Sequence, residues 1–334
     1  MRSEGRWYRW CLVLVLCVLS QEWWVSHVPA ADRARPLRIG ALTASWGPTP
    51  QIVGLRDGLL ELGYREDEDF VLGVRFTQGD LTALPEAARQ LVQYGVDLIV
   101  TSEDVPTKVA QQATSQIPIV FVSVSNPVGM GLVQSFARPG GNITGVTDLS
   151  FELGPKRLEV FRDLIPDLQR VLFPYDIHDT YSAMAAQAYR DAARRLGIVL
   201  VERPVGSAEE AQTVLGQVRK SEVDGLLQPF SAGLNIPGLI LKVIDQQGIP
   251  AVFAGSFWAE QGALASYGPD FHETGRQAAR LADKILKGAS PAKLPVEVNP
   301  KIEFVINLQT AKTLGLTIPP EVLFQADRLI RAPR

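Results

Sequence analysis

Small polar and aromatic residues follow directly after apolar runs at several points of the sequence. After LRIGALTA, VDLIV and PIVFV these residues are Ser45, Trp46, Thr101, Ser102, Ser123, Ser125 and Asn126. Farther along, the same pattern gives Tyr175, Asp176, Phe230, Ser256, Trp258 and Asp270. Hydroxyl, amide and carboxylate groups orient a small molecule by hydrogen bonds, and aromatic rings hold its flat or apolar part. These residues are the predicted ligand-binding set.

Some of these residues have a structural alternative. Trp46 and Trp258 are the only tryptophans after residue 30, and they either form an aromatic clamp or each pack within their own domain. Asp270 either pairs with a ligand ammonium or caps the helix that begins near Phe271. We interpret Glu103 and Asp104 as solvated charges at the rim of the binding cleft, although carboxylates at this place would favour a cationic or zwitterionic ligand.

Catalytic and cofactor motifs are missing from the sequence. The run GALTASWG after the first apolar segment lacks the GxGxxG pattern of dinucleotide sites, and neither a Walker A motif nor a GxSxG elbow occurs. His178 and His272 are the only histidines after residue 30, and neither has a second histidine at metal-ligand spacing. His178 lies between Asp176 and Asp179, a trio that is more often solvated in a loop than catalytic. We therefore predict no enzymatic activity, no cofactor and no metal site.

The first 30 residues differ from the rest of the chain. Three arginines precede the ten-residue apolar run CLVLVLCVLS, and small residues follow near Ala30, which is typical of a cleaved signal peptide. A membrane anchor is the alternative, but ten apolar residues are short of the roughly 20 that span a bilayer. Both cysteines, Cys11 and Cys17, lie in this segment, so the mature chain would contain none. We predict a periplasmic protein whose residues 1–30 are removed.

Composition and periodicity predict the fold class. Hydrophobic residues make up 46% of the chain and charged residues 21%, as in globular proteins, and the net charge of −3 disfavours nucleic acid as a partner. From Leu37, short apolar segments alternate with amphipathic segments at helical spacing, which indicates parallel sheets covered on both faces. The alternation restarts after a Gly- and Pro-rich stretch at 125–146. The sequence therefore predicts two doubly wound, Rossmann-like α/β lobes.

Helix ends and lobe boundaries can also be predicted. Ser207 with Glu210 forms a capping box, and the glycines that follow predicted helices are Gly63, Gly95, Gly197, Gly248 and Gly288. We assign 37–146 with 263–300 to one lobe and 147–262 with 301–330 to the other. The crossovers would lie near 145–149, 262–265 and 299–302, and the stretch 125–146 would be the rim of the binding cleft and the first crossover. A phosphate-binding loop is excluded there, because no Gly-Lys leads from it into a helix.

The sequence resembles the solute-binding components of ABC transporters that have the type I periplasmic binding protein fold. It is most similar to the group described as tryptophan/tyrosine transport substrate-binding proteins. The stretches that carry this resemblance are GLRDGLLELGY, QQATSQIPIVFVSVSNPVGMGLVQSFARPGGNITGV and ADKILKGASPAKLPVEVNPKIEFVINLQTAKTLGLTIPP. The loops TSEDV and FPYDIHDT depart from the pattern of the family, so the ligand cannot be transferred from it.

The resemblance implies a function that the residues allow. It implies an exported protein that traps an amino acid or a related small metabolite, which could be aromatic, between two lobes and delivers it to a membrane ABC permease. The alternative is a ligand-sensing protein that docks on a membrane receptor or kinase without transport, because fold alone does not separate these roles. We expect a monomer, while the identity of the ligand stays open.

Overall fold

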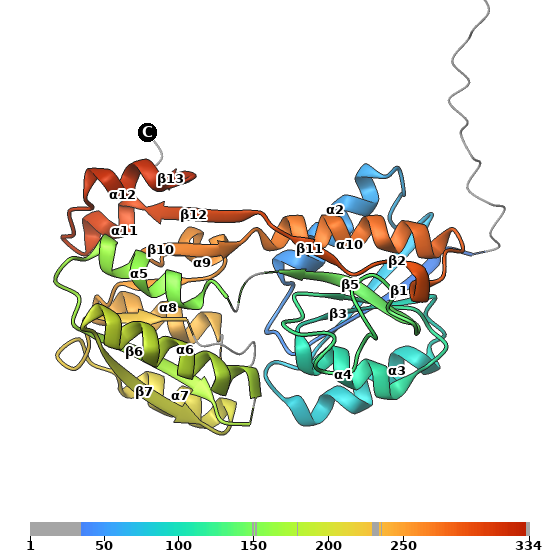
Figure 1. The fold of residues 1–334 in the computed structure, drawn as a ribbon, viewed down its shortest axis with the longest axis horizontal. Coiled ribbons are helices and arrows are strands. Elements are labelled where there is room, and N and C mark those ends of the chain that lie inside the picture. The colour runs from blue at the N-terminus through green and yellow to red at the C-terminus, as the bar shows by residue number, and fades with distance from the viewer. Residues whose placement is uncertain are drawn as a thin grey trace, which may run out of the picture. The chain divides into compact units, whose positions relative to one another are not determined.

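The computed structural model describes residues 35–148, 150, 152–178, 180–228, 234 and 236–331. The predicted signal peptide, Asp179 and the predicted ligand contact Phe230 lie outside these residues. From Leu37 onward the chain forms a unit of its own, which contains two β-sheets with helices on both faces of each (Figure 1). The predicted fold class of two α/β lobes is confirmed.

The first sheet has six strands, and all of its strand pairs are parallel. Their order is β11 (Glu297–Asn299), β5 (Ile143–Asp148), β4 (Ile119–Val122), β3 (Leu98–Ser102), β1 (Leu37–Thr43) and β2 (Phe70–Phe76). Helices α2 (Pro50–Glu61) and α10 (Phe271–Leu286) cover one face, and α3 (Leu84–Gln93) and α4 (Asp104–Ala113) cover the other. Two 3₁₀ turns, η1 (Leu81–Ala83) and η3 (Pro291–Lys293), complete this part.

The second sheet has seven strands, of which only the pair β10–β12 is antiparallel among the described strand pairs. Their order is β13 (Arg328–Ile330), β12 (Ile302–Asn307), β10 (Ala265–Pro269), β9 (Ala251–Phe253), β8 (Gly225–Leu227), β6 (Arg170–Asp176) and β7 (Val199–Val205). One face packs against α5 (Gly154–Leu164), α6 (Thr180–Leu196), α11 (Leu308–Thr313) and α12 (Pro320–Gln325). The other packs against α7 (Ala208–Gln217), α8 (Pro237–Gln247) and α9 (Ser256–Glu260).

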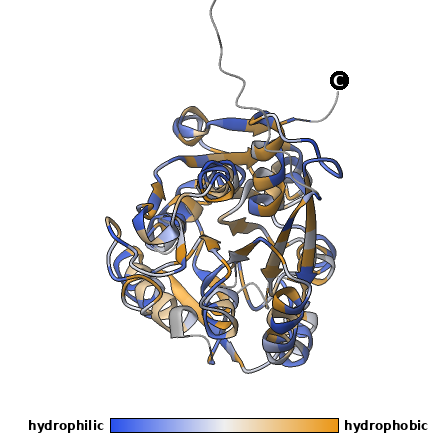
Figure 2. Ribbon diagram, turned by 90° about the vertical axis from the view of Figure 1, so that its right-hand side faces the viewer, coloured by the Kyte–Doolittle hydropathy of each residue, from blue (hydrophilic) through white to orange (hydrophobic). Residues whose placement is uncertain are grey.

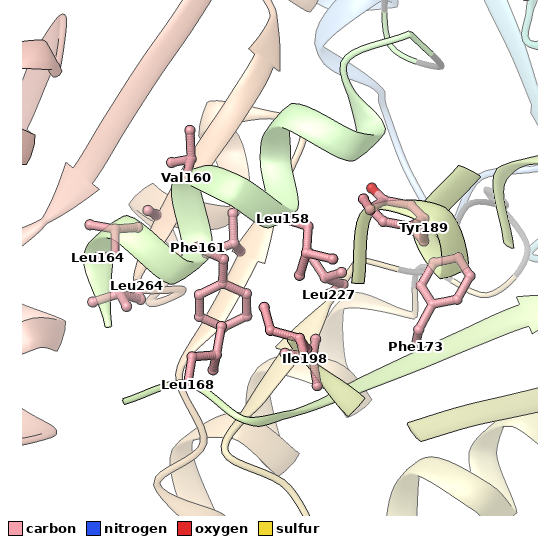
Figure 3. Close-up of a cluster of buried hydrophobic side chains, with 14 of the residues drawn as sticks. Leu158, Val160, Phe161, Leu164, Leu168, Phe173, Tyr189, Ile198, Leu227 and Leu264 are labelled. Atoms are coloured by element: carbon pink, nitrogen blue, oxygen red, sulfur yellow. The ribbon is translucent and has the colours of Figure 1, made fainter. Parts of the chain in front are cut away.

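The cores of both sheets follow from the apolar strands. In Figure 2 many strands are orange along much of their length, whereas the helices mix orange and blue residues, as expected for sheets buried on both faces. Figure 3 shows the core on the α5 face of the second sheet, where Leu158 and Phe161 of α5 lie near Leu227 of β8. Burial of such side chains, each worth about 1.5–3 kcal/mol, is the main stabilising contribution.

The strands differ from the predicted lobe boundaries at two places. The run Ile143–Asp148, predicted as part of a crossover, is strand β5 inside the first sheet. The strand Ala265–Pro269, predicted in the first lobe, pairs in the second sheet. The run Ile143–Asp148 was not interpreted as a strand, whereas Ala265–Pro269 was: an apolar segment predicts a strand but not the sheet in which it pairs. The chain passes from the first sheet to the second after Asp148, returns after Pro269, and crosses again between Asn299 and Ile302.

The predicted helix ends are present. The glycines after the helices, among them Gly63 and Gly248, have positive φ, a conformation that other residues adopt at a cost. The Ser207 hydroxyl accepts a hydrogen bond from the Glu210 N–H, and the Glu210 carboxylate accepts one from the Gly206 N–H. The carboxylate therefore bonds the N–H of the residue before the N-cap, whereas a usual capping box bonds the N–H of the N-cap residue itself.

Helices α2 and α10 lie side by side on the first sheet (Figure 1). A Cβ atom on Gly54 would collide with the backbone oxygen of His272, and one on Gly275 with that of Gln51. The two backbones can approach this closely only because both positions are glycine. This contact fixes the first turn of α2, which carries Gln51, against the first turn of α10.

Candidate functional site

Strands β1, β3, β4 and β5 are neighbours in the first sheet and run parallel, so their carboxyl ends lie along one edge. Ligands of doubly wound sheets bind outside this edge. Side chains alternate along a strand, and Val100 and Val146 belong to the core under α2 and α10. Ser102, two residues after Val100, and Asp148, two residues after Val146, therefore lie on the same face of the sheet.

Ser102 and Asp148 have unused hydrogen-bonding capacity. Ser102 is only 1% exposed and Asp148 only 7%. The Oγ atom of Ser102 and the Oδ2 atom of Asp148 are buried and have no hydrogen-bond partner among the residues that the structure describes. Since the large majority of buried polar atoms are bonded, two such atoms at one sheet edge make this edge the candidate ligand site.

Ser123 lies between these two residues in the order of the strands. It directly follows β4 and has a φ of 56°, and Glu103, which directly follows β3, has a φ of 75°. Positive φ in a residue other than glycine stores strain, which clusters at functional sites. The Ser123 hydroxyl accepts a hydrogen bond from Gln51 Nε2 at 3.1 Å, so α2 helps to hold it in place.

Burial controls the protonation of Asp148. Desolvation raises the pKa of this carboxyl above its ordinary value, although Ser123 and the backbone N–H of Ser150 lower it. The Ser150 N–H donates to Oδ1 at 3.0 Å. Glu152 raises the pKa further, and Arg157 lowers it. Among the described residues, Oδ1 is satisfied by Ser150, Oδ2 has no hydrogen-bond partner that meets normal geometry although Ser123 lies close to the carboxyl group, and no cation forms an ion pair with it.

Other predicted contacts of the first sheet are engaged within the protein. The Thr101 hydroxyl is buried on the opposite face, 2.7 Å from that of Thr107. The Ser45 hydroxyl donates to the Gly47 carbonyl at 2.7 Å, which closes the turn after β1. The Ser125 N–H donates to Asp104 Oδ1, and the Asn126 side chain accepts from the Gly129 N–H. Asp104 therefore holds the loop after β4, a role different from the predicted solvated rim charge.

Tyr175 and Asp176 end strand β6 of the second sheet. The Tyr175 ring packs against Phe173, with 5.9 Å between the ring centroids, and its hydroxyl accepts a hydrogen bond from Arg190. Asp176 is buried; its N–H donates to the Ser182 hydroxyl, and its carboxylate accepts from the His178 N–H. His178 is exposed, in agreement with the solvated-loop interpretation. These contacts order the loop that leads into α6.

The two tryptophans have different surroundings. Trp258 is 8% exposed and stacks on Phe253, with a centroid distance of 4.4 Å and an interplanar angle of 12°. It belongs to the core under α8, which favours the alternative of local packing. Ser256, the first residue of α9, is half-buried. Trp46 is half-buried in the loop after β1, at the carboxyl edge of the first sheet.

Asp270 caps helix α10. Its carboxylate accepts the Glu273 N–H at 2.9 Å and pairs with Lys301 Nζ at 2.8 Å. Burial alone would raise the pKa of Asp270, but the Lys301 ammonium and the Glu273 N–H outweigh it and keep the pKa below its ordinary value. The helix-cap alternative accounts for this residue, because its charge already has a cation.

Two residues of this edge were absent from the predicted set. Asp148 ends the run NITGVTD, which was interpreted as a crossover and not as a strand with a polar residue at its end. Gln51 lies in the first turn of α2, where a polar residue usually faces solvent, but it is only 5% exposed. Recognising 143–148 as an apolar strand would have identified Asp148 by the rule that identified Ser102.

Two features are absent from the described ranges. No group of three or more His, Cys, Asp or Glu side chains there could hold a metal ion. No helix among the same residues has the length and apolar character required to cross a bilayer.

Comparison with known proteins gives consistent matches. The sequence profile of the family described as "ABC transporter substrate binding protein" matches residues 49–330. A "Tyrosine-binding protein" of Clostridioides difficile (strain R20291) is 27% identical over 266 residues, which cover 79% of this chain and 76% of that protein.

Two solved structures extend the comparison to three dimensions. A conserved domain protein of Vibrio cholerae is 27% identical and superposes with a TM-score of 0.78, covering 88% of this chain and 100% of that one. An ABC domain from Streptococcus pneumonia, solved in complex with L-Trp, is 26% identical with a TM-score of 0.74 and the same coverage.

Proposed function

The chain belongs to the ABC transporter substrate-binding protein family, and on this premise we propose that its ligand is an amino acid with an aromatic side chain. The observation that carries this proposal is the similarity, across both sheets, to one protein named for tyrosine binding and another solved with L-Trp. The function of the chain is to bind the solute that an ABC transporter takes up.

The carboxyl edge of the first sheet supports an amino acid as the ligand. A zwitterion presents both donors and acceptors, and the unpartnered Ser102 hydroxyl together with Ser123 offers groups of either kind. Trp46, in the adjacent loop, could stack on a flat side chain, an interaction worth about 0.5–1.5 kcal/mol beyond the area that it buries. We retain these three residues of the predicted set as ligand contacts.

The proposal includes the cellular role of the protein. It works in the periplasm as a monomer after its signal peptide is removed, and it delivers the ligand to a membrane permease without altering it chemically. The family match supports this role, because its members are described as substrate-binding proteins and not as enzymes.

The test is calorimetric titration of the purified protein, stripped of bound ligand by unfolding and refolding. We expect saturable binding of L-tryptophan or L-tyrosine, weaker binding of L-leucine and no binding of myo-inositol. Mass analysis after incubation should recover the amino acid unchanged. Absence of binding for every amino acid tested, or release of a modified product, would contradict the proposal.

A further inference from the structure

The buried carboxyl group of Asp148 has no cation within ion-pair distance among the residues that the structure describes. Buried carboxylates are normally paired, because the desolvation of an isolated charge is costly. Asp148 is therefore either protonated when the site is empty or paired with a cation that the ligand brings.

Arg157 is the basic residue that acts on Asp148 electrostatically, but its guanidinium is already committed. It is 1% exposed and donates to the Tyr267 carbonyl at 2.8 Å, the Tyr189 hydroxyl at 2.8 Å and the Ser150 carbonyl at 3.4 Å. These contacts hold the guanidinium beside the crossover after β5. Arg157 would have to leave them to pair with Asp148.

Most other charges on the described elements packed against β5 are also paired, and the exception is Lys293 of η3, which is exposed. Within α10 and β11 the pairs are Glu273 with Arg276, Asp283 with Lys287, and Lys284 with Glu297. Lys301 pairs with Asp270 at the start of α10. The cations of these pairs are therefore already engaged and do not neutralise Asp148.

Polar groups surround the Asp148 carboxyl, and Ser123 lies close enough to lower its pKa. Ser150 satisfies Oδ1, while Ser123 is fixed next to the carboxyl by Gln51 and by a strained backbone. Ser102 contributes a second unpartnered polar atom on the same face. We propose that the Asp148 carboxylate is the receptor for the ammonium group of the ligand. This assignment rests on the proposed function and specifies which end of the amino acid meets the first sheet at β5.

The variant Asp148→Asn removes the charge and retains an oxygen for the Ser150 N–H, so the turn after β5 can persist. We expect its affinity for L-tryptophan to be roughly 10- to 100-fold lower than that of the wild type, the usual range for losing a hydrogen bond to a charged group. Indole-3-propionate, which lacks the ammonium group, should bind the wild type weakly and should lose little further affinity in D148N.

A second measurement, the pH dependence of binding by the wild type, can be made even where D148N does not fold. Because a protonated Asp148 must ionise to bind an ammonium group, the affinity of the wild type for L-tryptophan should increase as the pH is raised from 4. D148N should show a flatter profile.

The outcomes separate the two proposals. A wild type that binds L-tryptophan and indole-3-propionate equally, or a folded D148N with unchanged affinity, overturns the role of Asp148 and leaves the proposed function standing. A wild type that binds no amino acid overturns both.

Discussion

Ser102 and Ser266 place the same group, a hydroxyl, in similar surroundings, one on each sheet. Both hydroxyls are buried and have no hydrogen-bond partner within the described part of the chain. They differ in position, because Ser102 is the last residue of β3, whereas Ser266 lies inside β10 between the antiparallel strand β12 and β9. Only Ser102 is at the edge where ligands of such sheets bind.

This difference gives a matched pair of variants. Ser102→Ala should lower the affinity for the amino acid by about 3- to 10-fold, the effect of losing one neutral hydrogen bond. Ser266→Ala should leave the affinity unchanged. Neither variant should lose stability, because each removes a hydroxyl that makes no bond within the protein. Calorimetric titration and thermal unfolding of both variants check this, and an equal loss of affinity in both would argue against Ser102 as a contact.

Asp148 should make stability depend on pH in an unusual direction. Burial raises its pKa in the folded state above the ordinary value of 3.8, so the folded protein holds this proton more tightly than the unfolded chain. Its stabilising contribution is therefore complete below about pH 4 and is lost as the pH rises through the raised pKa. Urea unfolding between pH 4 and pH 8 should show the ligand-free wild type losing stability relative to D148N. Parallel curves for the two proteins would show that the carboxyl is not buried as described.

Candidate ligand contacts could be predicted from the sequence only where the ends of strands could be located. Polar residues after apolar runs identified Ser102 and Ser123, but the same rule included Thr101, whose side chain faces the other side of the sheet. Alternation along a strand decides this, and it requires knowing which face lies under α2 and α10. The N-cap role of Asp270 was predictable as an alternative, whereas its ion pair with Lys301 depends on how β12 returns to the second sheet.

At the scale of elements, the contact between α2 and α10 positions Gln51 and, through it, Ser123. A Cβ atom at residue 275 would meet backbone atoms of Gln51 and Leu55. Backbone atoms cannot move aside as the end of a flexible side chain can. The two helices must then separate to accept any larger residue.

Gly275→Ala should therefore destabilise the protein by about 1–3 kcal/mol, the usual cost of overpacking, despite the better helix propensity of alanine. It should also weaken ligand binding, because Gln51 shifts. Gly216→Ala in α7 is the matched control: its new methyl group meets open space, so it should be neutral or slightly stabilising. Chemical denaturation of both variants measures the difference. A fully stable G275A would mean that the two helices separate at little cost.

The alternation of elements was predictable, whereas their assignment to sheets was only partly so. Apolar strands and amphipathic helices identified most elements from Leu37 to Thr313, but β5, α9, α12 and β13 were not predicted. Strand β10 and helix α10 are adjacent in the sequence but belong to different sheets, and no local pattern marks the change at Asp270. Only non-local pairing reveals it.

At the scale of the whole molecule, the connection order is as informative as the fold. The first sheet takes its strands β1 to β5 from residues 37–148, but α10 and β11 come from residues 271–299. Strands β6 to β10 of the second sheet are inserted between these two parts. The complete first sheet therefore depends on contacts between residues more than 120 positions apart.

This order has a consequence for the newly made chain. While the ribosome is still adding residues, α2 has its glycine-lined face uncovered, because α10 is translated only after most of the second sheet. Contacts of such long sequence separation form slowly. The first sheet of the nascent chain can therefore be completed only after residue 299 has been synthesised.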